Sequence, residues 1–142
     1  MAYSAVELSK YIVTKCANDK CPITNLQLQK ILYYIQKDYL SRNELAFDDL
    51  FEAWQFGPVI RQVYYYFCGN GAMPIISKYD TVIDKSDRCH VDPIVEENEE
   101  VAEIRTFVSK AAKEFDERLS IHEVRLVQGK ESSNVIFDCV KL

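Results

Sequence analysis

The chain has 142 residues, a length typical of one domain. Hydrophobic residues make up 48% and charged residues 27%, which is ordinary for a globular protein and excludes a disordered chain. The 22 acidic and 17 basic residues give a formal net charge of −5. This charge disfavours nucleic acid as a partner, because domains that bind the phosphate backbone usually have more basic than acidic residues. We expect a single domain over residues 1–142.

The sequence contains no stretch that predicts a membrane span. Its longest uncharged segment, residues 62–77, is interrupted by Pro74 and two glycines. The first residues meet Glu7 and Lys10 before any apolar run, unlike a signal peptide. We therefore expect a cytoplasmic protein with no membrane contact, in which the five cysteines are reduced.

Helical spacing of apolar residues predicts two helices in the first third of the chain. The first should run over residues 4–17, with Ala5, Leu8 and Ile12 on one face. Thr24 and Gln27 have the spacing of a capping box and should begin the second. The apolar stripe of this second helix is formed by Leu28, Ile31, Leu32, Ile35 and Tyr39.

Residues 43–57 lack helical spacing and predict a loop or a short extended segment. The Gly57-Pro58 pair suits the beginning of a helix, because proline is tolerated at the first helical position. We expect that helix over residues 58–68, ended by Gly69-Asn70-Gly71. The residues predicted to share its core face are Val59, Ile60, Val63, Tyr64 and Phe67.

The second half of the chain is harder to assign. Residues 72–92 predict a short hairpin or an irregular loop, and Asp92-Pro93 should open a helix that reaches about residue 119. The tail, residues 120–142, suits either short strands or one last helix. The predicted fold is mainly α: a single compact helical domain whose minor β or irregular component lies in residues 72–92 and the C-terminal tail.

No catalytic motif is present, and we expect neither a metal nor a cofactor. The two histidines, His90 and His122, lie far in sequence from any nucleophile motif. The acidic residues from Glu96 to Glu103 are typical of a solvated first helical turn. Cysteine spacing disfavours zinc because no C-x-x-C pair occurs, which makes a metal-dependent enzyme only a remote alternative.

Aromatic residues are concentrated in two places. The run from Tyr64 to Phe67 follows Arg61 and suggests rings that stack on nucleic-acid bases, but net acidity favours a core with Tyr65 and Tyr66 at its edge. Trp54 and Phe56 precede the Gly-Pro turn, where such large rings either fill the core or anchor a partner.

Two sequence motifs resemble a known family. Residues 23–36 read ITNLQLQKILYYIQ, and residues 52–59 read EAWQFGPV, followed by Val63, Tyr64 and Phe67. Both are similar to the signatures of the Panacea antitoxin-domain family, which includes SocA-like antitoxins and GepA-like phage-associated proteins. The resemblance is strongest over residues 5–71. The tail, residues 120–142, diverges, because it lacks the Pro-Trp pair of many relatives.

The resemblance implies a small cytoplasmic protein, encoded by a bacterium, phage or prophage, that is not an enzyme. It implies neutralisation of a toxin by direct protein–protein interaction, with the toxin encoded by a neighbouring gene. For SocA-like members it also implies delivery of the toxin to a Clp-type protease. The alternative is a phage or mobile-element adaptor that binds a host protein without a cognate toxin. Homo-oligomerisation is left open.

Family positions fall on residues that we interpret as largely structural and on residues that we expect to contact a partner. The first group comprises Leu28, Leu32, Tyr34, Gln36, Trp54, Gly57, Pro58, Val59 and Tyr64. In the second group, Gln29, Lys30 and Tyr33 lie off the apolar stripe of their helix and are expected on its surface. Tyr65 and Tyr66 complete the predicted partner-binding residues.

Overall fold

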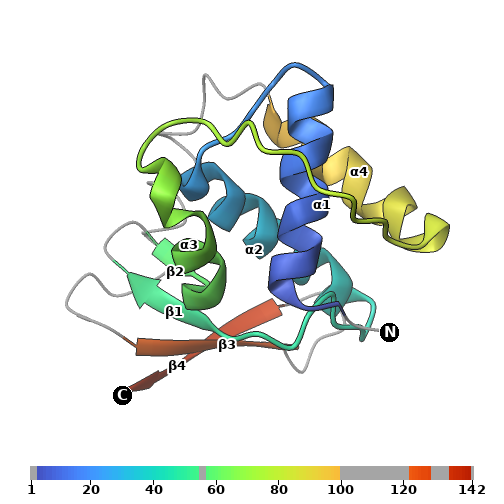
Figure 1. The fold of residues 1–142 in the computed structure, drawn as a ribbon. Coiled ribbons are helices and arrows are strands. Elements are labelled where there is room, and N and C mark those ends of the chain that lie inside the picture. Colours follow the sequence, from blue (N-terminus) through green and yellow to red (C-terminus); the bar gives the residue numbers. More distant parts are fainter. Residues whose placement is uncertain (1–2, 55–56, 100–121, 129–134, 142) are drawn as a thin grey trace.

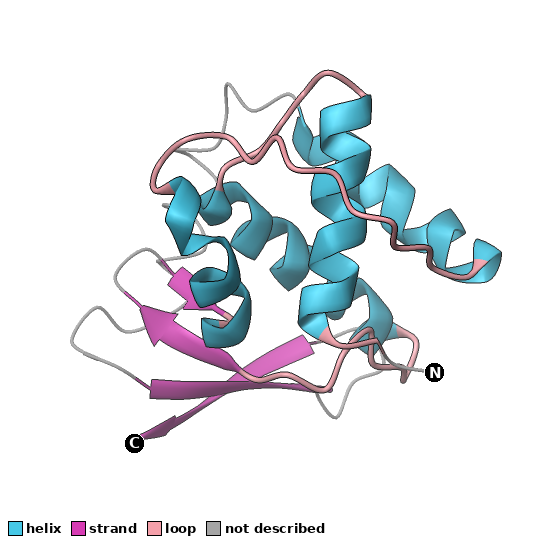
Figure 2. Cartoon of the chain, in the orientation of Figure 1, coloured by secondary structure: helices cyan, strands magenta, loops and turns pink. Residues whose placement is uncertain are grey.

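Helices lie on one side of a four-stranded antiparallel sheet in the computed structural model of this chain (Figure 1, Figure 2). The structure describes residues 3–54, 57–99, 122–128 and 135–141, and it describes side chains up to residue 98. Within these residues the protein is mainly helical, as the sequence predicted.

The first two helices begin at side-chain caps. Helix α1 spans Ala5–Asn18, and the Ser4 hydroxyl accepts a hydrogen bond from the backbone N–H of Glu7. Helix α2 spans Asn25–Ser41. The Thr24 hydroxyl accepts from the Gln27 N–H at 3.2 Å, and the Gln27 side chain accepts from the Thr24 N–H at 2.7 Å. Both predicted helices and the predicted capping box are confirmed.

The segment after α2 forms a hairpin instead of leading directly into a helix. Strand β1 spans Phe51–Trp54 and strand β2 spans Gly57–Val59, with Ala53 opposite Pro58. Because β2 is an edge strand, Pro58 can lack an N–H there without breaking an interior ladder. The prediction that Pro58 starts a helix is therefore wrong.

Helix α3 spans Arg61–Phe67, which makes it shorter than the predicted helix over residues 58–68. A 3-10 turn, η1, follows over Cys68–Asn70. The chain then leaves the turn at Gly71, whose φ of 57° is readily adopted by glycine. The predicted glycine stop is thus confirmed.

Residues 72–84 form an irregular strap, as one of the two predictions for this region proposed. Helix α4 then spans Lys85–Glu99, so it begins well before the predicted start at Asp92-Pro93. The Asp84 carbonyl opens its first turn by accepting from two backbone N–H groups, and Pro93 lies inside the helix. The earlier start lets Val91 and Val95 pack into the core. The predicted extension to residue 119 lies outside the described residues.

Strands β3, His122–Gln128, and β4, Val135–Lys141, confirm the strand alternative for the tail. The sheet has the order β2-β1-β3-β4. Phe51 of β1 pairs with Val124 of β3, so the tail shares one sheet with the segment that follows α2. Helix α2 contacts the sheet, whereas α4 packs against α1 and α2 (Figure 1).

The core is built around α1 and α2, which contribute the largest share of its buried apolar side chains. Ile75 and Ile83 anchor the strap in it, and Phe47 and Phe51 join it from the segment around β1. No helix among the residues that the structure describes is long and apolar enough to cross a membrane.

Candidate partner-binding surface

Helix α3 presents three successive tyrosines on the surface of the molecule. The exposed fractions of Tyr64, Tyr65 and Tyr66 are 37%, 60% and 47%. The helix buries Val63 and Phe67, which lie four residues apart and therefore on one face. Tyr64 was predicted in the core but lies at its edge, since it follows Val63 by about a quarter turn.

Ring contacts join these tyrosines to neighbouring elements. Tyr64 packs edge-on against Trp54 with ring centroids 4.9 Å apart, and against Tyr65 at 5.7 Å. Tyr66 lies 6.2 Å from the Tyr79 ring in the strap. Aromatic pairs at these separations are attractive and restrict ring motion. We call the surface formed by these five residues, Trp54, Tyr64, Tyr65, Tyr66 and Tyr79, the tyrosine face.

Two charged groups flank the tyrosine face. The Lys10 ammonium lies 5.1 Å from the Tyr66 ring centroid and 5.7 Å from that of Tyr79, within cation–π range. The Arg61 guanidinium pairs with the Glu52 carboxylate at 2.5 Å, and the Arg61 side chain stays 49% exposed. The surface therefore combines aromatic rings, hydroxyl groups and positive charge.

Two polar side chains of α2 hold α3 in place. Gln29 Oε1 accepts a hydrogen bond from the N–H of Ile60, the N-cap residue of α3, at 2.9 Å. Asn25 Nδ2 donates to the Tyr64 carbonyl at 3.0 Å, and Gln29 Nε2 donates to Asn25 Oδ1 at 3.4 Å. A seven-residue helix is marginal on its own, so these buried bonds help to fix the tyrosine face.

Gln36 has a similar role toward the segment that leads to β1. Its Oε1 accepts from the Ala46 N–H at 2.9 Å, and its Nε2 donates to the Phe47 carbonyl at 2.8 Å. The amide thus satisfies two buried backbone groups in the way that a neighbouring strand would. Gln29 and Gln36, two of the three glutamines in residues 23–36, thus both bond to backbone groups inside the molecule.

Three residues that were expected on the surface of α2 are buried. Gln29 is 0% exposed, and Lys30 and Tyr33 are each 1% exposed. The prediction of their exposure is wrong, because the segment that forms β1 and β2 covers the face of α2 beside the apolar stripe. Tyr33, for example, packs edge-on against Phe51 of β1, with ring centroids 6.2 Å apart. Burial lowers the pKa of Lys30 to about 8. Partner contact stays a prediction for the exposed Tyr65 and Tyr66.

The other family positions occupy the interior or its border. Leu28 and Leu32 are fully buried in α2, and the three residues of β2 are buried as well. Tyr34 and Trp54 are half-buried, and Phe56 lies outside the described residues. Trp54 Nε1 is buried and has no hydrogen-bond partner within the described part of the chain.

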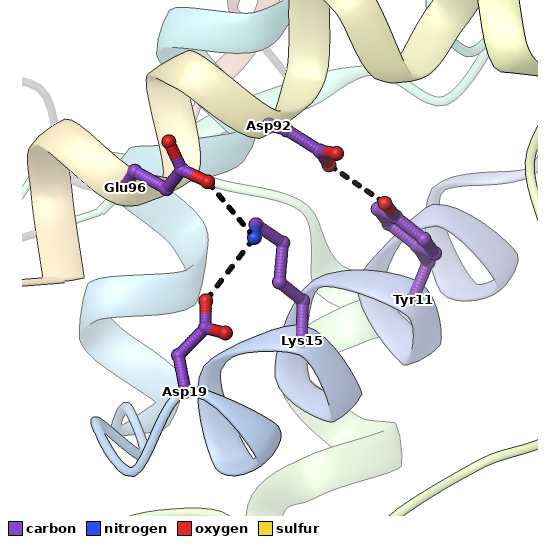
Figure 3. Close-up of polar contacts among 5 residues, drawn as sticks. All are labelled: Tyr11, Lys15, Asp19, Asp92 and Glu96. Atoms are coloured by element: carbon purple, nitrogen blue, oxygen red, sulfur yellow. Dashed lines mark hydrogen bonds and ion pairs between the residues drawn. The ribbon is translucent and has the colours of Figure 1, made fainter.

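A second cluster, which the sequence did not reveal, joins α4 to α1 and α2. The Tyr11 hydroxyl donates to Asp92 at 2.6 Å, and Lys15 Nζ lies 3.1 Å from both Asp19 and Glu96 (Figure 3). Asp87 of α4 accepts from two further hydroxyls, those of Tyr3 at 2.7 Å and Tyr39 at 2.5 Å. This cluster becomes visible in the sequence only once the helix is known to begin at residue 85.

The surroundings of this cluster keep its tyrosines and Lys15 in their protonated forms, in which they donate hydrogen bonds to the carboxylates. Burial, together with the Asp87 carboxylate, raises the pKa of Tyr3 to about 12, and burial and neighbouring carboxylates raise the pKa of Tyr11 and Tyr39 as well. Desolvation lowers the pKa of Lys15, but its hydrogen bonds to carboxylates outweigh this effect and raise the pKa overall. All four groups therefore remain donors at neutral pH.

The described residues provide no constellation for metal-dependent chemistry. No group of three or more His, Cys, Asp or Glu side chains among them could hold a metal ion. Cys16 is buried, Cys21 is half-buried, and Cys68 and Cys89 are exposed. The side chains of His122 and Cys139 lie beyond the described part of the chain.

Comparisons with known proteins agree with the resemblance seen in the two motifs. A family model described as "Antitoxin SocA-like, Panacea domain" matches residues 28–129. Antitoxin SocA of Caulobacter vibrioides (strain NA1000 / CB15N) is 38% identical over 72 residues, a segment that covers 50% of this chain but only 38% of that protein. No solved structure matches. Because the family model covers more than half of its length, this chain belongs to the family of SocA-like antitoxins with a Panacea domain.

Proposed function

We propose that this protein is a non-enzymatic binding module, an antitoxin that neutralises a protein toxin by direct contact. Family membership supports an antitoxin role. The single structural observation that supports direct binding is the tyrosine face. Three of its four tyrosines, Tyr64, Tyr65 and Tyr66, are more than a third exposed although their rings are large and apolar.

The chemistry of the tyrosine face suits a protein partner. Tyrosine and arginine are enriched at the centres of protein interfaces because each offers a large contact area together with polar groups. Here Tyr65 and Tyr66 extend from a helix that ring contacts and buried hydrogen bonds hold in place. A rigid face loses little conformational entropy on binding. We assign Tyr65 and Tyr66 as the principal contact residues and Arg61 as a rim residue.

Co-expression with the products of neighbouring genes tests this function. The chain should rescue growth from one of them and should copurify with it. The Tyr65→Ala/Tyr66→Ala double variant should bind at least about 10-fold more weakly, since truncation of a central aromatic anchor often costs 2 kcal/mol or more. The matched control is Leu45→Ala/Leu50→Ala, which removes two exposed apolar side chains, 46% and 40% exposed, from another region. This control should bind like the original chain.

The outcomes separate the antitoxin from its alternatives. Absence of both rescue and a complex for every neighbouring product would contradict the proposal. Capture of a host protein without a toxin would favour the phage or mobile-element adaptor. The half-life of the toxin in the same cells, measured with and without a Clp-type protease, distinguishes simple occlusion from delivery for degradation.

A further inference from the structure

Helix α4 is attached to the rest of the molecule through a short apolar stripe and through side-chain carboxylates. Of its residues up to 98, Val91 and Val95 alone are fully buried. Ile94 is half-buried and packs against the core. Asp87 lies four residues before Val91, and Asp92 lies three residues before Val95 and four before Glu96, so the three carboxylates flank the buried valines. The contact face of α4 thus combines an apolar stripe with carboxylates along its edges.

The surface beneath α4 has the complementary chemistry. Four hydrogen-bond donors meet the three carboxylates, and each bond has its donor outside α4 and its acceptor on α4. We call the surface formed by these donors, Tyr3, Tyr11, Lys15 and Tyr39, the donor surface. Tyr11 and Lys15 belong to α1 (Figure 3), Tyr39 belongs to α2, and Tyr3 lies just before α1. The donor surface is therefore complementary to the carboxylates of an acidic helix.

The strap before α4 is held to the core at several points, so a separate opening of α4 would begin after Ile83. Ile75 and Ile83 are buried, the Ile75 N–H donates to the Ile23 carbonyl at 2.7 Å, and the Tyr79 N–H donates to the Thr14 hydroxyl at 2.8 Å. Within α4, Pro93 lacks the N–H that would bond to the Cys89 carbonyl, which weakens the helix. Elements with few buried apolar contacts open at lower free energy than the core.

We propose that α4 is a displaceable cover over the donor surface and that this surface binds an acidic amphipathic helix of a partner protein. The α4 sequence itself shows what such a partner helix needs: carboxylates at the positions of Asp87, Asp92 and Glu96 and small apolar residues at those of Val91 and Val95. This inference rests on the contacts between α4 and the donor surface and is independent of the antitoxin role.

Competition with a synthetic peptide tests the proposal. The probe is a peptide with the α4 sequence, residues 85–99, added to the full chain. Asp92→Ala/Glu96→Ala in the chain removes bonds from the intramolecular cover and leaves the donor surface intact. Two lost bonds correspond to about a tenfold rise in the open population. Because the peptide binds only that open population, its apparent affinity should rise by the same factor.

Hydrogen exchange measures the opening independently. In the double variant the α4 amides should exchange about tenfold faster, while the protection of α1 and α2 stays unchanged. A peptide that carries the same two alanines should bind about tenfold more weakly than the original peptide. Glu97→Ala is the matched control, because Glu97 is exposed on α4 and has no hydrogen bond among the described residues. It should alter neither exchange nor binding.

Several outcomes would overturn the proposal. Exchange of α4 only together with α1 and α2 would show that it does not open separately. Separate opening without peptide binding, or equal binding of the alanine peptide, would show that the donor surface does not select a helix. Dimerisation of the double variant, measured by sedimentation, would assign the surface to a second copy instead. If the double variant does not fold, the same measurements can be made on the single Glu96→Ala variant, because the Glu96 side chain is 59% exposed and its removal should leave the fold intact.

Discussion

Helices α2 and α4 are similar in length, at 17 and 15 residues, but they are held in the molecule by different interactions. Eleven residues of α2 are buried, including polar side chains that bond to the backbone of other segments. Among the α4 residues up to 98, Val91 and Val95 alone are buried, Ile94 packs against the core, and three carboxylates bond to groups outside the helix. Burial makes α2 the centre of the fold, whereas α4 combines a few apolar contacts with polar bonds that water can replace.

This difference clarifies the meaning of the motif in residues 23–36. The motif lies in and just before α2, and its buried polar members Asn25, Gln29 and Gln36 point to backbone atoms of α3 and of the segment before β1. Those bonds shape the hairpin and orient α3. The motif therefore specifies a scaffold, and the surface that this scaffold displays lies on α3.

The largest predicted effect comes from the core of α2. Leu32→Ala should lower the free energy of unfolding by about 2–5 kcal/mol, because Leu32 is 0% exposed and its truncation leaves a cavity. Urea denaturation monitored by circular dichroism measures this loss.

Val95→Ala in α4 provides the contrasting variant. It should accelerate hydrogen exchange mainly within residues 85–99, with a smaller loss of global stability. A loss as large as that of Leu32→Ala would contradict the distinction between the two helices.

A smaller effect is expected when a buried amide of α2 is removed. Gln29→Leu deprives the Ile60 N–H of its acceptor and should cost about 1–3 kcal/mol, the usual penalty for an unsatisfied buried group. Hydrogen exchange should show the greatest loss of protection in α3. Gln62→Leu, at an exposed position of α3, is the matched control and should change stability by less than about 0.5 kcal/mol. Equal effects of the two variants would refute the positioning role.

The sequence predicts α2 well because local signals agree there. Its capping box and its apolar stripe indicate the same helix, and the structure contains it. For α4 the local signals disagree with the packing. Asp92-Pro93 is a favourable helix start, but the burial of Val91 and Val95 outweighs the cost of an internal proline. Hydrophobic patterning alone does not show whether the local preference for a helix start or the burial of side chains in the folded protein decides where the helix begins.

The predicted contact residues show where helix periodicity fails as a guide. Residues beside an apolar stripe are exposed only where the rest of the protein covers no other face of the helix. In α2 the hairpin segment covers a second face, so that Lys30 and Tyr33 are buried. Helix α3 has a single buried face, formed by Val63 and Phe67, and Tyr65 and Tyr66 are exposed beside it, whereas Tyr64 was predicted in the core and lies at its edge. The number of covered faces is a property of the tertiary fold.

Alkaline pH should weaken the attachment of α4 before it affects α2. The pKa of Tyr3 is raised to about 12, and those of Tyr11 and Tyr39 are raised as well. A raised pKa means that the folded state favours the protonated phenol. The resulting stability is fully present below pH 10, where the phenols are neutral in both states, and is lost as the pH rises through 12.

Chemical denaturation from pH 8 to 12 tests this dependence. Tyr11→Phe should flatten the decline in stability, because it removes one of the titrating groups. Tyr65→Phe changes an exposed tyrosine on α3, which forms none of the hydrogen bonds to the α4 carboxylates, and should leave the profile unchanged. An identical slope in all three proteins would contradict the assignment of the decline to the α4 contacts.

The smallest predicted effect concerns the charged pair at the end of the same cluster. Lys15→Met removes contacts to Asp19 and Glu96, whose side chains are 37% and 59% exposed. Solvent-exposed pairs of this kind contribute about 0.2–1 kcal/mol each, and 1 M NaCl screens most of that. Denaturation in low and high salt should therefore separate the two proteins only at low salt. A loss of unfolding free energy well above 1 kcal/mol that persists in 1 M NaCl would show that Lys15 holds α4 through the packing of its buried stem. In that case charge would contribute less to the donor surface than the tyrosine hydroxyls do.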